Sequence, residues 1–430
     1  MGSIILTTAI FIVCLILIFS EKVNRTIVAI IGAIIMVTVG SLAGFFTQED
    51  VVKTIDFTTL GLLLGMMILV ALLEPTGFFQ YLAVYVGKLS KGNPYVLLVL
   101  LGGVTTIVSM FLNNVTTVVL IAPVTILICE ILGVTAMPFL MAEAILSNTG
   151  GVATLVGDPP NILISSAAHF TFNDFLIRSL PIVVVTLLAV LFYLIRYFKN
   201  DLDNCLGCDL EGLEQLDPLE ALIDRENANR VLIVVIIAII GFLLEDFFSL
   251  RPSYIAIAAG GIGLLWVRPD IKETFKLVEW DILCFFTGLF VMVGALEAAG
   301  VLSILSDIIV RWIHLPPVIL GIILLWIVAL LSAIVDNVPI TIAMIPVLQG
   351  LAGSGIEVTA LWWALVFGAG FGGNGTIIGS TANVVVAAIS EKTRTPISPR
   401  TWSKVGIPVM IVSCAVSSVL YVLVYYFIGF

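Results

Sequence analysis

Amide and carboxylate side chains interrupt two long apolar stretches of the chain, and the two interruptions match. Asn113-Asn114 recurs 223 residues later as Asp336-Asn337, with a valine next and a proline nine residues after the second asparagine in both copies. An unpaired polar group is costly in an apolar environment, and such groups commonly bind ions, protons or polar solutes there. The duplication therefore predicts one polar site that is built from two related halves of the chain.

A second pair of interruptions follows the first pair in each half. Gly150-Gly151, Thr154, Gly157 and Asn161 recur 222 residues later as Gly372-Gly373, Thr376, Gly379 and Asn383. In the first copy two prolines also follow, so one regular helix cannot continue through the segment. Unwound backbone at membrane depth must line a cavity, where free carbonyl groups and helix N-termini bind ions or polar solutes.

Each half contributes one carboxylate, at a different place in the shared pattern. Asp158 of the first half matches Ser380, and Asp336 of the second half matches an asparagine. Acids within membrane segments are costly and usually functional, and a buried carboxyl group can carry a proton through a transport cycle. We therefore predict that Asp158 and Asp336 couple transport to protons, with Glu143 as a further candidate in the same network.

The candidate site combines amides, hydroxyls, glycines and acids from both halves, and no cofactor or metal ion is expected in it. The predicted solute- or ion-binding residues are Asn113, Asn114, Thr117, Asn148, Thr149, Gly151, Thr154, Asp158, Asn161, Asp336, Asn337, Thr341, Gly373, Asn374, Thr376, Ser380 and Asn383. Cys205 and Cys208 have metal-ligand spacing but no second cysteine pair, so we expect no zinc site there. Glu74 and Glu297 end apolar segments, and a position at the membrane interface explains them.

The composition of the chain indicates a membrane protein. Of its 430 residues 60% are hydrophobic and only 11% are charged, and the mean hydropathy is +1.20. A soluble exterior needs many more charged groups, whereas apolar runs of about 17 to 25 residues are typical of membrane-spanning helices. We predict an all-α polytopic membrane protein, and the net charge of −10 gives no reason to expect a nucleic-acid partner.

The chain divides into two hydrophobic halves and an acidic linker. Residues 1–198 contain the long segment 95–133 and the broken helix 137–168, and residues 230–430 contain the long segment 316–352 and the broken helix 358–390. Hydropathy alone leaves open whether each long segment crosses the membrane twice or forms one re-entrant hairpin. The linker, 199–229, holds nine acids between positions 201 and 226 and is expected to include a short helix at 219–229. The stretches 78–91 and 301–314 are expected to lie along the membrane surface.

The basic residues indicate an orientation. When the segments are threaded back and forth, fifteen of the 19 Lys and Arg residues fall on one side of the membrane and four on the other. The positive-inside rule makes the first side cytoplasmic and places both termini outside the cytoplasm. The segment 95–133 then starts and ends inside, and 316–352 starts and ends outside, so the halves are expected to be repeats of inverted topology.

Four segments resemble the ion transporter superfamily, most closely its branch of arsenite permeases, NhaD and the melanosomal P-protein. These segments are FLNNVTTVVLIAPVTILICEIL (111–132), AEAILSNTGGVATLVGDPPNILI (142–164), DNVPITIAMIPVL (336–348) and FGGNGTIIGSTANVVVAAI (371–389). The resemblance covers essentially the whole chain. It implies that the long segments are re-entrant hairpins and that about ten helices span the membrane, and relatives in this superfamily often form homodimers.

The hairpin tips depart from those of the dicarboxylate and citrate carriers in this superfamily, which have Ser-Asn-Thr at both tips. Here the second tip has an acid instead of a hydroxyl, and neither broken segment contains Arg or Lys. Added negative charge in a low dielectric disfavours a polyanionic solute. The first hypothesis is therefore proton-coupled efflux of arsenite or antimonite, as neutral As(OH)3 or Sb(OH)3, through the inner membrane of the cell.

Two other transport hypotheses remain. One is a Na+/H+ antiporter or a P-protein-like anion or pH-regulating transporter, which would bind Na+ in competition with protons. The weaker one is a dicarboxylate carrier. No enzyme activity is expected, and the chain has no P-loop, so any ATP-driven step would need a separate ATPase subunit.

Overall fold

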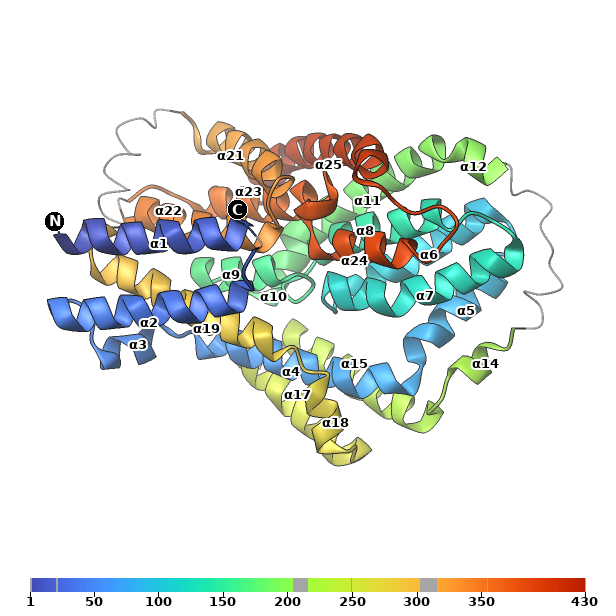
Figure 1. Ribbon diagram of the computed structural model, residues 1–430, viewed down its shortest axis with the longest axis horizontal. Coiled ribbons are helices and arrows are strands. Elements are labelled where there is room, and N and C mark those ends of the chain that lie inside the picture. The colour runs from blue at the N-terminus through green and yellow to red at the C-terminus, as the bar shows by residue number, and fades with distance from the viewer. Residues whose placement is uncertain are drawn as a thin grey trace.

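The structure, a computed structural model, describes residues 2–20, 22–203, 216–248, 250–301, 315–353 and 355–429. Throughout these ranges the regular structure is helical, without any strand (Figure 1). The helices of the first half are α1 (Gly2–Ser20), α2 (Arg25–Ala43), α3 (Gln48–Thr54), α4 (Phe57–Leu73), η1 (Glu74–Thr76), α5 (Phe78–Leu89), α6 (Pro94–Ser109), α7 (Asn114–Leu132), α8 (Met137–Gly151), α9 (Pro159–Ala168), α10 (Phe172–Asp174), η2 (Phe175–Ser179) and α11 (Leu180–Tyr197).

The linker and the second half continue the same pattern. Their elements are α12 (Lys199–Asp203), α14 (Pro218–Ala221), α15 (Arg225–Leu243), α16 (Glu245–Phe248), α17 (Pro252–Val267), α18 (Ile271–Lys276), α19 (Trp280–Ala298), α21 (Pro317–Ser332), α22 (Asn337–Gly353), α23 (Thr359–Gly372), η3 (Ile377–Gly379), α24 (Thr381–Ser390) and α25 (Pro399–Phe427). The cysteine pair Cys205 and Cys208 and most of the stretch 301–314 lie outside the described residues.

The helix lengths fit a polytopic membrane protein. Among the described residues, seven helical segments are long and apolar enough to cross a membrane: Arg25–Ala43, Phe57–Thr76, Asn114–Leu132, Phe172–Tyr197, Arg225–Leu243, Trp280–Ala298 and Pro399–Phe427. Shorter apolar helices of 10–17 residues form the other parts of the two hairpins, both pieces of the second broken helix, α17 and most of α1. The all-α class predicted from the sequence is confirmed.

Both long apolar segments are helical hairpins, as the resemblance implies. In the first hairpin α6 and α7 are joined by a short turn, and Asn113 Oδ1 accepts a hydrogen bond from the N–H of Val115 at 3.2 Å. In the second hairpin α21 and α22 are joined in the same way, and Asp336 Oδ1 accepts from the N–H of Val338 at 3.2 Å. A short polar side chain at this place satisfies a free N–H at a helix start. The duplicated polar pairs therefore lie at the hairpin turns.

Both predicted broken helices are also present. The first is interrupted between α8 and α9, and the second between α23 and α24. Asp158 and Ser380 are the N-cap residues of the second helical pieces, with φ/ψ of −144°/137° and −152°/137°. Neither side chain caps its own helix. Because the two backbones match so closely, the first break presents a carboxylate where the second presents a hydroxyl.

The helices of the two halves pack on one another in a repeated pattern. Within each half the hairpin packs on the first piece of the broken helix, α6 on α8 and α21 on α23. Between the halves α7 packs on α24, α22 on α9, α4 on α17 and α2 on α19. Figure 1 shows the hairpins on opposite sides of the molecule, α21 and α22 at the left and α6 and α7 at the right. Their tips therefore approach a common centre beside α8 and α23, which are buried except for the first residue of each helix.

Glycines allow the closest of these contacts. A methyl group added at Gly150 would lie 2.6 Å from the carbonyl oxygen of Thr106, and one added at Gly372 would lie 2.5 Å from that of Ala329. These two contacts are equivalent in the repeats. Both join the end of a buried helix to the hairpin of the same half, so the duplicated glycines are required by packing.

The substitution Gly150→Ala is expected to destabilise the protein by about 1–3 kcal/mol, because the contacted atoms belong to the backbone and cannot move aside. Gly103→Ala is the matched control, since a methyl group there would meet nothing within 4 Å. The control should be neutral or slightly stabilising, because alanine favours helix more than glycine does. Thermal unfolding followed by tryptophan fluorescence in detergent measures both effects. Equal unfolding temperatures for the two variants would contradict the packing role.

Capping residues set two helix boundaries. The expected linker helix at 219–229 is two helices, because Asp224 accepts a hydrogen bond from the N–H of Asn227 and so starts α15 at Arg225. The last helix starts at Pro399, because Ser398 caps it at the N–H of Thr401. The first turn of each of these helices is polar, so hydropathy does not assign it to the helix. A capping residue marks where the helix begins.

Candidate functional site

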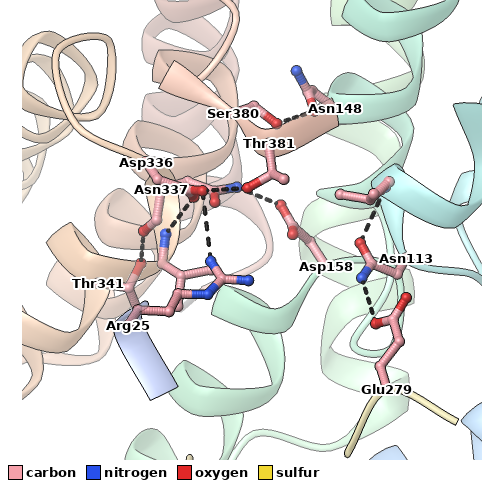
Figure 2. A network of polar contacts seen from close by, with 12 residues as sticks. Arg25, Asn113, Asn148, Asp158, Glu279, Asp336, Asn337, Thr341, Ser380 and Thr381 are labelled. Atoms are coloured by element: carbon pink, nitrogen blue, oxygen red, sulfur yellow. Dashed lines mark hydrogen bonds and ion pairs between the residues drawn. The ribbon is translucent and has the colours of Figure 1, made fainter. Parts of the chain in front are cut away.

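The two hairpin tips and the two helix breaks meet in one buried polar junction (Figure 2). Asn337 Nδ2, from the second tip, donates to Asp158 Oδ2, from the first break, at 2.8 Å. Ser380 Oγ, from the second break, donates to Asn148 Oδ1 of α8 at 2.9 Å. All four side chains are buried. Since both hydrogen bonds join one half of the chain to the other, the junction exists only when the two repeats are assembled.

Asn148 lies at the centre of this junction. Its Nδ2 donates to Asn374 Oδ1 and to Asn383 Oδ1, each at 2.9 Å. Its Oδ1 accepts from Ser380 and, at 3.4 Å, from Asn114 Nδ2. A primary amide has two donor hydrogens and two acceptor lone pairs, so every hydrogen-bonding position of Asn148 is used.

Asn114 connects the first hairpin tip to this network. Its Oδ1 accepts a hydrogen bond from Ser109 Oγ at 2.7 Å. Ser147 Oγ donates to the carbonyl oxygen of Asn114 at 3.2 Å. A methyl group at Gly151 would collide with the Asn114 side chain. Gly151 therefore leaves room for the amide of Asn114. Gly373 leaves room for a different group, the backbone carbonyl of Gly379.

Several predicted site residues bind the backbone instead. Asn161 Nδ2 donates to two carbonyl groups of its own break, those of Gly151 and Thr154, and Asn383 repeats this pattern in the second half. Hydroxyl groups also donate to carbonyl groups, and these residues are Thr117, Thr149, Thr154, Thr341 and Thr376. These side chains hold the tips and breaks in shape. The groups that remain to meet a solute are mainly the amides, the two aspartates and Ser380.

Asp336 is held by residues from outside its own hairpin. Its Oδ2 accepts a hydrogen bond from Thr381 Oγ1 of α24 at 2.6 Å and lies 3.6 Å from Nη1 of Arg25 at the start of α2. The Arg25 guanidinium also lies 5.6 Å from the centre of the Phe285 ring, on α19. Arg25 is one of the fifteen basic residues that the positive-inside rule assigns to the cytoplasmic side, and this rule gives no sign of its contact with Asp336.

Asn113 is held by an acid that the sequence analysis did not select. Its Nδ2 donates to Glu279 Oε2 at 3.1 Å, and Thr116 Oγ1 donates to Glu279 Oε1 at 2.9 Å. Glu279 is the N-cap residue of α19. The two tips therefore have opposite partners: an acidic side chain binds the neutral tip, and a basic side chain binds the acidic tip.

Glu143 is fully buried but lies apart from these contacts. Its Oε1 accepts a hydrogen bond from Thr125 of α7, and its Oε2 is buried without a hydrogen-bond partner. The sequence prediction placed Glu143 in the network of the first break. In the structure its hydrogen bond instead joins the two helices α7 and α8, so its role in proton coupling stays a prediction.

Two repeat-related cavities flank the junction. One, of about 320 Å³, is lined by Asn113, Thr116 and Pro159 of the tip and break, with the charged residues Glu74, Lys276 and Glu279. The other, of about 310 Å³, is lined by Glu297, Lys53 and Asp56, which are the residues 223 positions away from those three charged ones. Glu74 and Glu297, expected at the membrane interface, thus both line cavities. Only the first cavity is lined by a tip residue, so the two sides of the junction differ in access.

The four described cysteines lie away from this centre. None of Cys14, Cys129, Cys284 and Cys414 lines either cavity. Within the described ranges no group of three or more His, Cys, Asp and Glu side chains is arranged to hold a metal ion. The chemistry of the junction is therefore that of amides, hydroxyls and carboxylates.

Duplicated hairpins and broken helices that meet at a shared buried polar centre define this chain as a multi-pass membrane transporter. It belongs to the citrate transporter family, whose model matches residues 15–368. The resemblance to the ion transporter superfamily and its P-protein branch is thereby confirmed.

Similar proteins cover nearly the whole chain. A 46 kDa membrane protein of Mycobacterium leprae is 38% identical over 424 residues, which are 96% of this chain and 97% of that protein. The P protein of Homo sapiens is 33% identical, over 93% of this chain and 57% of its own length. Among solved structures, the YdaH transporter of Alcanivorax borkumensis aligns with a TM-score of 0.65 over 94% of this chain and 99% of its own, at 14% sequence identity. That likeness concerns the fold alone.

Proposed function

We propose that this transporter exchanges protons for a small inorganic solute without net charge, with arsenous acid and antimonous acid as the first candidates. The observation that supports proton coupling most directly is the environment of Asp158. Its carboxylate is only 3% exposed and accepts a hydrogen bond from Asn337 of the other repeat. A carboxyl group at the contact between two moving repeats can bind a proton in one state and release it in the other.

The charges at the junction support a neutral solute. Asp158 and Asp336 contribute two carboxylates, and Arg25 is already paired with Asp336. A citrate or dicarboxylate ion would meet net negative charge there, which is costly in a low dielectric. As(OH)3 offers hydroxyl donors and acceptors without net charge, and the amides at the junction can satisfy them. Citrate, which the family description names, is therefore a solute to test. The charges at the junction argue against citrate as the solute.

The cavities support alternating access. The first cavity reaches Asn113 and Pro159 and contains Lys276, which the positive-inside rule assigns to the cytoplasm. Its repeat-related partner contains Lys53, which the same rule assigns to the outer side. Under this proposal the structure accepts solute from the cytoplasm, as efflux requires, and both termini lie outside the cytoplasm.

Sodium/proton antiport is the second candidate, and the two aspartates are the observation that favours it. Carboxylate and amide oxygens are the ligands that hard cations prefer. Asp158, Asp336 and the amides beside them would offer such oxygens if the hydrogen bonds among them rearranged.

Everted membrane vesicles test the two candidates together. With an acidic interior, arsenite or antimonite should accumulate without sodium, and accumulation should stop when nigericin and potassium remove the pH gradient. The control vesicles come from cells that lack the protein. Sodium-dependent loss of the pH gradient without arsenite uptake would establish the antiporter instead. Accumulation of citrate alone would contradict the charge argument.

A further inference from the structure

Arg25 contacts the second hairpin tip from a separate part of the molecule. It is the first residue of α2, and its Nη1 lies 3.6 Å from Asp336 Oδ2 (Figure 2). The Asp336 side chain is 11% exposed and that of Arg25 is 31% exposed. The separation exceeds that of a hydrogen bond, so the attraction is chiefly electrostatic. Such a pair can separate once the charge on either partner is removed.

The other groups that face Asp336 are mostly uncharged. Thr381 of α24 donates a hydrogen bond to it, and the helices α1, α21 and α23 that pack on α22 contain no charged residue. Two further helices pack on α22: α9, which follows the N-cap residue Asp158, and α19, which contains Asp281 and Glu297 and follows the N-cap residue Glu279. In the described part of the chain, Arg25 is thus the cation paired with Asp336.

The N-terminal ends of α2 and α19, here called the support, hold Arg25 and also contact the first tip. Helix α2 packs on α19, and Thr26 Oγ1 donates to the carbonyl oxygen of Asp281 at 3.1 Å. Glu279, next to the start of α19, binds Asn113 and Thr116. The joined ends of α2 and α19 therefore contact both tips, one through a base and the other through an acid. Movement of the hairpins relative to these helices must break or exchange both contacts.

We propose that Arg25 is a tethered cation that neutralises Asp336 in this state and leaves it when the coupling proton binds there. The proton comes from water on one side of the membrane, adds to a carboxylate oxygen of Asp336 and is released to water on the other side. Protonation removes the charge that attracts the guanidinium, so hairpin and support can separate. This inference rests on the proposed proton coupling and adds Arg25 to it as a positioning residue.

The second half of the chain provides a matched control. Arg251 stands at the start of α17 as Arg25 stands at the start of α2, and its Nη1 donates to Thr58 Oγ1 at 3.3 Å, a neutral group. Removal of that charge changes the electrostatics of an exposed residue at the start of its helix, not those of the tip.

Hydrogen–deuterium exchange of the purified protein tests the contact without any solute. Exchange in the peptide that covers residues 335–341 should be about three- to tenfold faster in Arg25→Gln than in the wild type, because the unpaired acid weakens the tip. Arg25→Lys should resemble the wild type, and so should Arg251→Gln. Identical exchange in wild type and Arg25→Gln would overturn the proposal, whether or not arsenite is the solute.

The competition with protons is tested by the pH dependence of arsenite uptake into vesicles. Arg25→Gln leaves the Asp336 carboxylate without its paired cation, so the pH of half-maximal uptake should differ measurably between this variant and the wild type. Arg251→Gln should leave the pH of half-maximal uptake unchanged.

Chemical modification tests the need for a positive charge at position 25. In a variant that retains no other cysteine, Arg25→Cys should regain the wild-type pH dependence of uptake after reaction with a cationic methanethiosulfonate and not with a neutral one. Equal effects of both reagents would overturn the proposal. If wild-type protein moves no arsenite, the proposed solute fails while the exchange experiment still decides the role of Arg25.

Discussion

Asp158→Asn is expected to abolish proton-driven accumulation of the solute while the protein remains folded. Asparagine keeps the shape of the side chain and a carbonyl oxygen that can still accept the hydrogen bond from Asn337. It cannot bind and release a proton. A gradient of about 2 pH units supports about hundredfold accumulation for each proton exchanged, because each unit corresponds to about 1.4 kcal/mol. In the variant the accumulation ratio should fall to about one.

The control for this experiment separates coupling from binding. Exchange of labelled for unlabelled arsenite across vesicles without a gradient should persist in Asp158→Asn, since this exchange needs no net proton movement. Asp336→Asn should behave in the same way, and Glu273→Gln, at an exposed acid paired with Lys276, should retain full accumulation. Unchanged pH-driven accumulation in both aspartate variants would exclude these residues as the coupling groups.

The hairpins and breaks could be predicted because their causes are local and duplicated. Gly150-Gly151 and Gly372-Gly373 end their helices at related places, and the tips begin new helices with capping side chains. A sequence that repeats such interruptions in two apolar halves has few alternative folds. The inverted topology followed from the number of segments between the repeats, without any structural information.

The partners of the tips could not be predicted because they come from distant parts of the chain. Arg25 is 311 residues from Asp336 and Glu279 is 166 residues from Asn113. Both lie at helix starts, where hydropathy assigns charged residues to the membrane surface. Only the packing of α2 on α19 brings them to the buried centre. A basic residue at one helix start and an acidic residue at another, in a chain whose duplicated tips have an acid and an amide, would be the sequence signal for such partners.

The roles of the hydroxyl groups were not predictable for another reason. A threonine beside a helix break can bind a solute or a free carbonyl group, and the two uses have the same sequence. Thr154 and Thr376 donate to the carbonyl groups of Met110 and Ala333, which are equivalent positions in the two repeats. The repetition of both contacts shows that they maintain the backbone of the break. The amides were better candidates, since they link the two repeats directly.

A protein without cysteines is expected to retain arsenite efflux. Arsenic binds thiolates more tightly than it binds amides, but a carrier must also release its solute. None of the four described cysteines lines either cavity, whereas the amides lie at the junction. Replacement of all six cysteines by serine or alanine should therefore lower efflux from cells less than about twofold, since it leaves the amides of the junction in place.

Asn114→Ala and Asn337→Ala, in that cysteine-free protein, are expected to lower efflux by about tenfold or more. Asn337→Ala removes an amide that links the repeats and its hydrogen bond to Asp158, and Asn114→Ala removes the first-tip amide that bonds Asn148, at about 1–3 kcal/mol for each lost contact. Asn93→Ala, at the exposed start of α6, is the control and should retain efflux. Lost efflux in a correctly inserted cysteine-free protein would show that thiols carry the arsenic. Retained efflux in both junction variants would place the solute away from the hairpin tips, because a binding site built on these amides is weakened by the loss of either one.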